Sequence, residues 1–234
     1  MNVQEATTRR LPDLKERHLP ENCRETINTI LKETYGYEQF RNLEIYDDLS
    51  KGKEKLCISQ GQLIENVILE AEKAWKSETQ VDNILLTAPT GSGKSLLFQL
   101  PAIYLGKEYN LLTIVVSPLK ALIVDQVESL QELGYMRVAY ASSDLSPEQK
   151  MEVYRQVREG EIDLFYLSPE LLLSYDIKHF VGERRIGLVV VDEAHTVTTW
   201  GKEFRVDYWF LGRYLTALKQ TLGYNFPLFA LTAT

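Results

Sequence analysis

The feature that most limits how this chain can fold is the alternation, from residue 56 onward, of short apolar runs with longer helix-like stretches. The apolar runs are mostly continuous and rich in Val, Ile and Leu, which is typical of strands buried on both faces of a sheet. They cover residues 84–88, 112–117, 137–140, 164–167, 188–191 and 228–231. Strands that alternate with helices in this way predict an α/β domain with a mainly parallel β-sheet flanked by helices.

The intervening stretches have apolar residues at helical spacing over residues 62–75, 94–106, 119–133, 147–159 and 208–222. The fourth has a clear start signal, because Ser146 can cap the helix, Pro147 suits its first position and Gln149 completes a capping box. Ligands of parallel α/β sheets bind at the carboxyl ends of the strands. The residues that directly follow each apolar run are therefore the candidates for function.

The first 55 residues differ from the rest because they are rich in charge and poorly periodic. One helix is expected from Glu21 to about residue 34, since Ile27, Ile30 and Leu31 recur at helical spacing. The sequence therefore predicts a mostly helical N-terminal extension of unassigned role over residues 1–55 and one folded domain over residues 56–234.

Composition narrows the possible functional classes. The 234 residues carry a formal net charge of −7, which excludes a globally basic protein that coats nucleic acid by charge alone. No apolar run approaches the ~20 residues that span a bilayer, and the polar N-terminus lacks the apolar core of a signal peptide. Cys23 and Cys57 belong to no C-x-x-C pair, so structural zinc is not expected. We expect a cytoplasmic protein, or a nuclear one in a eukaryote, with no membrane partner.

The first apolar run leads into A-P-T-G-S-G-K-S at residues 88–95, which fits a phosphate-binding loop with Ala at its first position. Glycines let the backbone turn its N–H groups onto a phosphate chain, Lys94 would reach the β- and γ-phosphates, and the Ser95 hydroxyl would bind Mg²⁺. The alternative is a glycine-rich surface turn, which the position between a strand and a helix disfavours. The candidate nucleotide ligands here are Thr90, Gly91, Ser92, Gly93, Lys94 and Ser95.

The fifth apolar run ends in Asp192-Glu193-Ala194-His195, the pattern of a Walker-B element. Asp192 would hold Mg²⁺ opposite Ser95, and Glu193 would orient and deprotonate the attacking water. His195 follows directly, where it could relay the nucleotide state to a neighbouring domain. An acidic pair at a strand end is usually a solvated turn, but the phosphate loop on the same sheet edge favours a catalytic role.

These motifs resemble those of superfamily 2 helicases, and the sequences between them narrow the resemblance to the RecQ family. S-P-L-K-A-L at residues 117–122, with D-Q-V at 125–127, resembles the family's first DNA-contact motif, and S-P-E-L-L at 168–172 resembles its S/A-P-E-R-L element. W-G-K-E-F-R at residues 200–205 occupies the position of its aromatic-rich loop, and residues 232–234 match its T-A-T motif. The DNA-contact and coupling candidates are Ser117, Lys120, Ser168, Trp200, Phe204, Arg205, Thr232 and Thr234.

The aromatic residues also have a physical interpretation of their own. Trp200 and Phe204 are one helical turn apart beside the acidic pair, and exposed aromatic rings can stack on nucleobases, while Arg205 can contact a phosphate. The alternative places both rings in the core. Ser117, Lys120 and Ser168 lie where helices are expected to begin, a position that favours phosphate oxygens but that also fits ordinary capping.

The residue that reads adenine has two candidates. Y-G-Y-E-Q-F-R at residues 35–41 resembles the family's F-G-Y-x-x-F-R, but Glu44 stands where Gln is expected and the segment is too far from Lys94 along the chain. Gln62 heads the helix before the first strand, and its amide can donate and accept one hydrogen bond each at the adenine edge. We therefore expect Gln62 to read adenine; the alternative is a solvent-facing glutamine.

The resemblance implies the first RecA-like P-loop NTPase domain of an ATP-dependent DNA helicase or translocase, with ATP and Mg²⁺ as cofactors. It also implies single-stranded or partly duplex DNA as partner, 3′-to-5′ movement and a role in DNA repair or recombination. No second RecA-like lobe follows Thr234 in this chain, so we expect a fragment of a longer protein that hydrolyses ATP poorly by itself. Two alternatives stay open: an RNA-remodelling ATPase with the same motifs, and a non-motor ATP-gated scaffold or sensor in a larger assembly.

Overall fold

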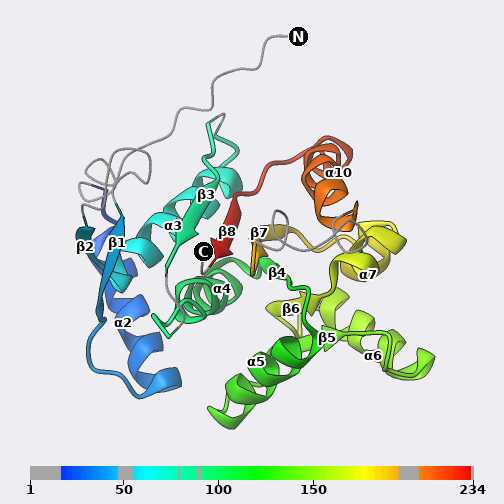
Figure 1. The fold of residues 1–234 in the computed structure, drawn as a ribbon, viewed down its shortest axis with the longest axis horizontal. Helices are drawn as coiled ribbons and strands as arrows, with labels where there is room; N and C mark the ends of the chain where they lie inside the picture. The colour runs from blue at the N-terminus through cyan, green and yellow to red at the C-terminus, as the bar shows by residue number, and fades with distance from the viewer. Residues whose placement is uncertain (1–16, 47–54, 79, 89–90, 195–205, 233–234) are drawn as a thin grey trace.

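A computed structural model of the chain describes residues 17–46, 55–78, 80–88, 91–194 and 206–232. Its centre is a six-stranded sheet with the strand order β3-β8-β7-β4-β6-β5, in which every pair of neighbours is parallel (Figure 1). The strands are β3 (Ile84–Thr87), β4 (Leu112–Val116), β5 (Val138–Ala141), β6 (Leu164–Leu167), β7 (Ile186–Val191) and β8 (Leu228–Thr232). All six predicted strands are confirmed, and so is the parallel α/β architecture.

Helices cover both faces of this sheet, and one hydrophobic core lies on each side of it. One core contains residues of α3 (Gln60–Trp75), α4 (Leu96–Tyr109) and α5 (Lys120–Glu132). The other contains residues of α6 (Pro147–Arg158), α7 (Pro169–Ser174), α8 (Ile177–Val181) and α10 (Val206–Leu222). Leu188 and Val190 of β7 face the first core and Val189 the second, which explains why the strands are continuously apolar.

The ends of the helices follow from local chemistry. Ser146 and Gln149 form the predicted capping box at the start of α6. The helix predicted from residue 94 begins instead at Leu96, because Gly93 is held in the left-handed region by the turn that precedes it. The helix predicted from residue 62 begins at Gln60, where Ser59 accepts a hydrogen bond from the Gly61 N–H.

The N-terminal part contributes the predicted helix and an antiparallel hairpin that the sequence did not indicate. The helix, α2 (Glu21–Tyr35), buries Ile27, Ile30 and Leu31 in the first core. The hairpin strands are β1 (Asn42–Tyr46) and β2 (Lys55–Ser59), paired in register. None of the helices in the described ranges is long and apolar enough to cross a bilayer.

A buried carboxylate ties the N-terminal segment to the domain. Glu70 of α3 is 1% exposed and accepts from Arg17 at 2.6 Å, Lys73 at 2.9 Å and the Asp82 N–H at 2.8 Å. Burial alone would raise the pKa of Glu70, but these donors outweigh it and hold that pKa below its ordinary value of 4.5. The charged form of Glu70 therefore stabilises the fold.

We expect Glu70→Gln to lower the free energy of unfolding at pH 7 by about 1–3 kcal/mol, because two cations lose their charged partner. A carboxylate with a lowered folded-state pKa contributes stability above its unfolded pKa and loses it as pH falls through the folded value. The wild-type protein should therefore lose stability below about pH 4.5, and the variant should lose less over the same interval. Denaturant titrations from pH 7 to pH 3 measure this. Glu33→Gln, at an exposed position of α2, is the control that should behave as wild type.

Candidate functional site

The loop after β3 lies at the carboxyl edge of the sheet and is held there by the neighbouring strand. The Ala88 N–H donates to the Thr232 carbonyl oxygen at 3.0 Å, so the end of β8 anchors the start of the loop. Lys94 Nζ donates to the Ala88 carbonyl oxygen at 2.9 Å, which keeps the ammonium group folded over the loop. Pro89 and Thr90 lie outside the described residues. The two ends of the predicted phosphate loop are thus brought together at one sheet edge.

Two glycines and one buried glutamine shape this loop. Gly91 and Gly93 have φ angles of 80° and 76°, in the left-handed region that favours glycine. Gln60, 3% exposed, accepts from the Arg41 N–H at 3.1 Å and donates from Nε2 to the Ser92 carbonyl oxygen at 3.3 Å. A Cβ on Gly93 would lie 2.7 Å from that Nε2 atom. A Cβ at residue 93 would therefore press on the Gln60 amide that clamps the loop.

We expect Gly93→Ala to weaken nucleotide binding at least tenfold, because the added methyl group displaces Gln60 from both of its hydrogen bonds and strains the backbone. Gly91→Ala is the matched control: it has the same backbone strain, but no atom lies within 4 Å of the added Cβ. It should therefore lose less affinity. Titration with a fluorescent ATP analogue measures both variants, and equal losses would contradict the role of Gln60.

The acidic turn after β7 lies on the other side of β8 from the phosphate loop. The Asp192 N–H donates to the Val116 carbonyl oxygen at 2.9 Å, and the Ala194 N–H donates to the Leu231 carbonyl oxygen at 2.8 Å. Asp192 Oδ1 accepts from the Glu193 N–H at 2.9 Å. Glu193 has a φ of 51°, a conformation that costs a non-glycine residue on the order of 1 kcal/mol. His195 lies outside the described residues.

β8 therefore carries both halves of the site. Its residue Leu231 is bonded to the acidic turn and its residue Thr232 to the phosphate loop. Neighbouring strands are ~4.8 Å apart, so the two loops are separated by roughly 10 Å at this edge. Ser95 and Asp192 belong to these two loops.

A pocket of about 200 Å³ adjoins the phosphate loop. Its lining combines Gly93, Ser95, Leu96 and Gln99 with Gln60 and with four residues of the N-terminal part, Tyr35, Tyr37, Gln39 and Arg41. The expectation that residues 35–41 lie too far from Lys94 is therefore wrong. The reason is the hairpin β1–β2, which begins directly after Arg41 and ends at Ser59. The chain thus returns to Arg41, and the Gln60 N–H donates to the Arg41 carbonyl oxygen at 2.9 Å.

Without the hairpin, Arg41 would be followed directly by Gln60, Gly61 and Gln62. Gln62 would then stand three residues after Arg41, where the family's motif has glutamine. In the linear sequence Glu44 occupies that place. The two segments pack closely, since a Cβ on Gly61 would lie 2.6 Å from the Phe40 ring. Gln62 itself is partly exposed and does not line the pocket, whereas Gln60 does. Sequence reasoning missed Gln60 because its contacts, to Arg41 and Ser92, are set by tertiary structure.

Hydrogen bonds lead from this pocket into the domain. Tyr35 Oη donates to Gln99 Oε1 at 3.2 Å, and Gln99 Nε2 donates to Gln126 Oε1 of α5 at 2.8 Å and contacts Tyr166 Oη of β6 at 3.3 Å. Burial raises the pKa values of both tyrosines, so both stay neutral and act as hydrogen-bonding groups. Gln99 thus links the pocket to elements that carry the DNA-contact candidates.

The DNA-contact candidates lie in different surroundings. Thr232 is 6% exposed, and its carbonyl oxygen accepts from the Ala88 N–H. Ser117 is 2% exposed, and its Oγ has no hydrogen-bond partner among the described residues. Lys120 is exposed and pairs with Asp144 at 3.0 Å, which lowers the pKa of that carboxyl group, and also with Ser143. Ser168 caps α7 by accepting from the Leu171 N–H. Trp200, Phe204, Arg205 and Thr234 lie outside the described residues.

The sequence profile of the DEAD/DEAH box helicase family matches residues 69–234, and the chain belongs to that family. Within it the chain is RecQ-like, which confirms the predicted resemblance. It is 31% identical over 209 residues to the ATP-dependent DNA helicase RecQ of Haemophilus influenzae. It is 34% identical over 216 residues to the RecQ protein of Synechocystis sp..

These two alignments cover 89% and 90% of this chain but only 28% and 38% of the relatives. They extend into the N-terminal part, beyond the residues that carry the sequence motifs. The solved structure of the DUF1998 helicase MrfA bound to DNA and AMPPNP has the same fold, with a TM-score of 0.59 at 20% identity. That likeness covers 93% of this chain and 27% of the other. The domain is thus the first RecA-like domain of a RecQ-like superfamily 2 helicase.

Proposed function

We propose that this chain is the ATP-binding and ATP-hydrolysing lobe of a RecQ-like DNA helicase that moves 3′ to 5′ along one strand. The observation that carries the proposal is the junction at β8, where Leu231 is bonded to the acidic turn and Thr232 to the phosphate loop. The RecQ-named relatives support DNA as the substrate. We assign residues 56–234 to the ATPase domain and residues 1–55 to an N-terminal segment that braces it through α2.

The residues present fit a magnesium nucleotide. Mg²⁺ in nucleotide sites is typically bound by one or two carboxylates together with phosphates and water, and the acidic turn and the phosphate loop are both bonded to β8. Ser95 and Asp192 would hold the ion, which neutralises developing phosphate charge when bound. Lys94 would leave the Ala88 carbonyl oxygen for the β- and γ-phosphates. Glu193 would accept the proton of the attacking water, and His195 would report the nucleotide state.

The pocket beside the loop suits the base of the nucleotide. Tyr37 is exposed, and its ring has the Arg41 guanidinium group 5.8 Å from its centroid. A planar base could stack against such groups, as aromatic and guanidinium planes allow. Gln62 remains a prediction for reading the adenine edge, from a position beside this pocket and not in its lining. Gln60 is the clamp that joins the pocket to the phosphate loop.

The DNA side of the proposal rests on residues after β4, β6, β7 and β8. Ser117, Lys120 and Ser168 would contact phosphates, Trp200 and Phe204 would stack on bases, and Arg205, Thr232 and Thr234 would couple DNA to the ATP site. The exposed Lys120 ammonium group could exchange Asp144 for a DNA phosphate, since an exposed ion pair is weak. A DNA helicase of this kind would work in the cytoplasm at the nucleoid, or in the nucleus, in repair or recombination.

ATP hydrolysis by the full-length protein, with single-stranded DNA or RNA of the same sequence added, tests the proposal. We expect stimulation by DNA and little by RNA. Equal or greater stimulation by RNA would favour the RNA-remodelling alternative. Hydrolysis that responds to neither polymer, with no strand separation, would favour an ATP-gated scaffold or sensor.

We expect Trp200→Ala in the full-length protein to leave basal ATP hydrolysis nearly intact and to remove most of its stimulation by single-stranded DNA. The reason is that stacking on a base is worth ~1–3 kcal/mol, and Trp200 lies a few residues after the acidic turn in the sequence. Thermal unfolding is the control, because a core tryptophan would cost ~3–5 kcal/mol of stability and lower every activity together. A stable variant that still responds fully to DNA would contradict the coupling role.

A further inference from the structure

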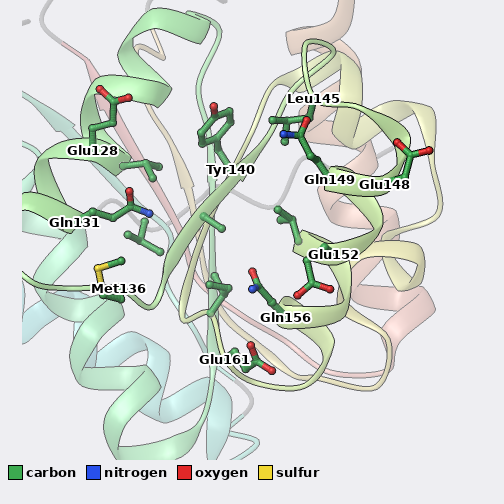
Figure 2. Close-up of a pocket in the computed structure, with 15 residues that line it drawn as sticks. Glu128, Gln131, Met136, Tyr140, Leu145, Glu148, Gln149, Glu152, Gln156 and Glu161 are labelled. Carbon is green, nitrogen blue, oxygen red and sulfur yellow. The ribbon is translucent and has the colours of Figure 1, made fainter.

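A groove runs along the open edge of β5, at the end of the sheet opposite the phosphate loop (Figure 2). Its volume is about 810 Å³. The floor is formed by Val138, Ala139 and Tyr140 of β5. The walls are α5, which packs in the first core, and α6, which packs in the second. The edge strand is therefore recessed between two helices and faces solvent only along the groove.

The backbone of β5 has groups that point into this groove. The Asp163 and Leu164 N–H groups both donate to the Arg137 carbonyl oxygen, so the backbone of Arg137 is hydrogen-bonded on the β6 side. Because alternate residues of a parallel strand bond to the same neighbour, Ala139 and Ala141 also face β6. The N–H and C=O groups of Val138 and Tyr140 therefore point away from it. A further extended strand could pair with them.

Both walls combine apolar and acidic residues. On the α5 side lie Val127, Glu128, Gln131 and Met136, and Met136 is 65% exposed. On the α6 side lie Glu148 and Glu152, both exposed (Figure 2). A hydrogen bond from Ser146 lowers the pKa of Glu148, and one from Arg155 lowers the pKa of Glu152, so both are charged at neutral pH. Four lining residues are glutamates, Glu128, Glu148, Glu152 and Glu161, and none is Lys, Arg or His. The neighbouring Arg155 pairs with Glu152 at 2.7 Å and with Glu161 at 2.9 Å, so the groove keeps an excess of negative charge.

We propose that this groove binds an extended segment of a partner protein by β-strand addition to β5, with apolar and basic side chains alternating along the segment. Side chains of an added strand alternate between the two faces of the sheet. One set would pack against Val127 and Met136, and the other would carry Lys or Arg toward Glu148 and Glu152. This surface is separate from the proposed nucleotide and DNA sites and does not depend on them.

Charge excludes two other occupants. DNA and RNA are polyanions, and the glutamates of the rim would repel them. A second copy of this chain would bring an identical acidic rim against the first, which is also repulsive. A basic segment instead gains electrostatic complementarity on the α6 side.

The probe is a fluorescein-labelled ten-residue peptide of alternating valine and lysine, titrated against the protein at low salt. We expect saturable binding that Glu148→Lys/Glu152→Lys weakens at least about tenfold. Glu21→Lys/Glu25→Lys is the matched control, since it reverses two exposed charges at the start of α2. It should bind the peptide as wild type does. Thermal unfolding establishes that both double variants are folded.

Two N-methylated peptides test the backbone pairing without changing the protein. One carries the methyl groups on its valines and the other on its lysines. In an added strand every second N–H faces β5, so one of these peptides should lose most of its affinity and the other should keep it.

Several results would overturn the proposal. They are no saturable binding of the parent peptide, equal binding of the two methylated peptides, or equal affinity for the Glu148→Lys/Glu152→Lys variant. Competition by single-stranded DNA for the same groove would assign it to nucleic acid instead. A dimer in sedimentation that the Glu148→Lys/Glu152→Lys change alters would assign the edge to a second copy of this chain.

Discussion

Lys94→Ala should weaken the binding of ATP at least about 100-fold. Lys94 is the cation of the phosphate loop, and charge-assisted hydrogen bonds contribute ~1.5–3 kcal/mol each, so losing its contacts to two phosphates has a large effect. Within the described part of the chain, Lys94 Nζ donates its hydrogen bond inside its own loop, to the Ala88 carbonyl oxygen. We therefore expect the fold to tolerate the change. Titration with a fluorescent ATP analogue measures affinity, and thermal unfolding measures the fold.

Lys107→Ala is the matched control for that experiment. It removes an exposed lysine from the last turn of α4, the helix that begins directly after the phosphate loop. Its affinity for ATP should equal that of the wild-type protein. If Lys94→Ala binds ATP as well as this control does, the phosphate-loop assignment is wrong.

Glu193→Gln in the full-length protein should lower the turnover of ATP by a factor on the order of 10²–10⁴, because the amide keeps size and hydrogen bonding but cannot accept a proton. Affinity for ATP should stay close to wild type, since Glu193 is proposed to act on water and not on the nucleotide. Steady-state hydrolysis and nucleotide titration separate the two quantities. Near-normal turnover would mean that another group activates the water.

The left-handed backbone of Glu193 provides a second comparison at the same position. Asparagine adopts φ angles near 51° more readily than glutamine does. Glu193→Asn should therefore be at least as stable as Glu193→Gln while being just as inactive. This pair distinguishes loss of the proton acceptor from loss of the turn that presents it.

The strands of this fold were predictable because burial on both faces leaves a strong local signal. Residues 112–116 and 188–191 contain almost only β-branched and aliphatic side chains, and both form central strands. The hairpin β1–β2 was not predictable in the same way. Its strands alternate polar and apolar residues, N-L-E-I-Y and K-L-C-I-S, but each run is only five residues long and lies in a charge-rich segment. Its pairing is fixed by closure onto Arg41 and Gln60, which is a tertiary property.

The site shows the same division. The phosphate loop and acidic turn were identified from the sequence because their chemistry depends on spacing within a few residues. The pocket beside them depends on a contact between residues 35–41 and the loop, which the hairpin β1–β2 separates along the chain. The number of residues between this segment and Lys94 therefore did not indicate how close the two lie in space. Gln60 gave no signal at all, because a glutamine at a helix start looks the same whether it clamps a loop or faces solvent.

The position of β8 has a consequence for how the protein is made. β3 has β8 as its strand neighbour in the described sheet, and the Leu228 N–H donates to Asn83 across a sequence separation of 145 residues. While the chain emerges from the ribosome, β3 is already outside long before its partner is synthesised. The edge that bears the phosphate loop must therefore wait, unpaired, until β8 inserts between β3 and β7. We infer that nucleotide can act as a ligand for folding only after that insertion, so the ATP site assembles only once β8 has been synthesised and is slowed by a long-range closure.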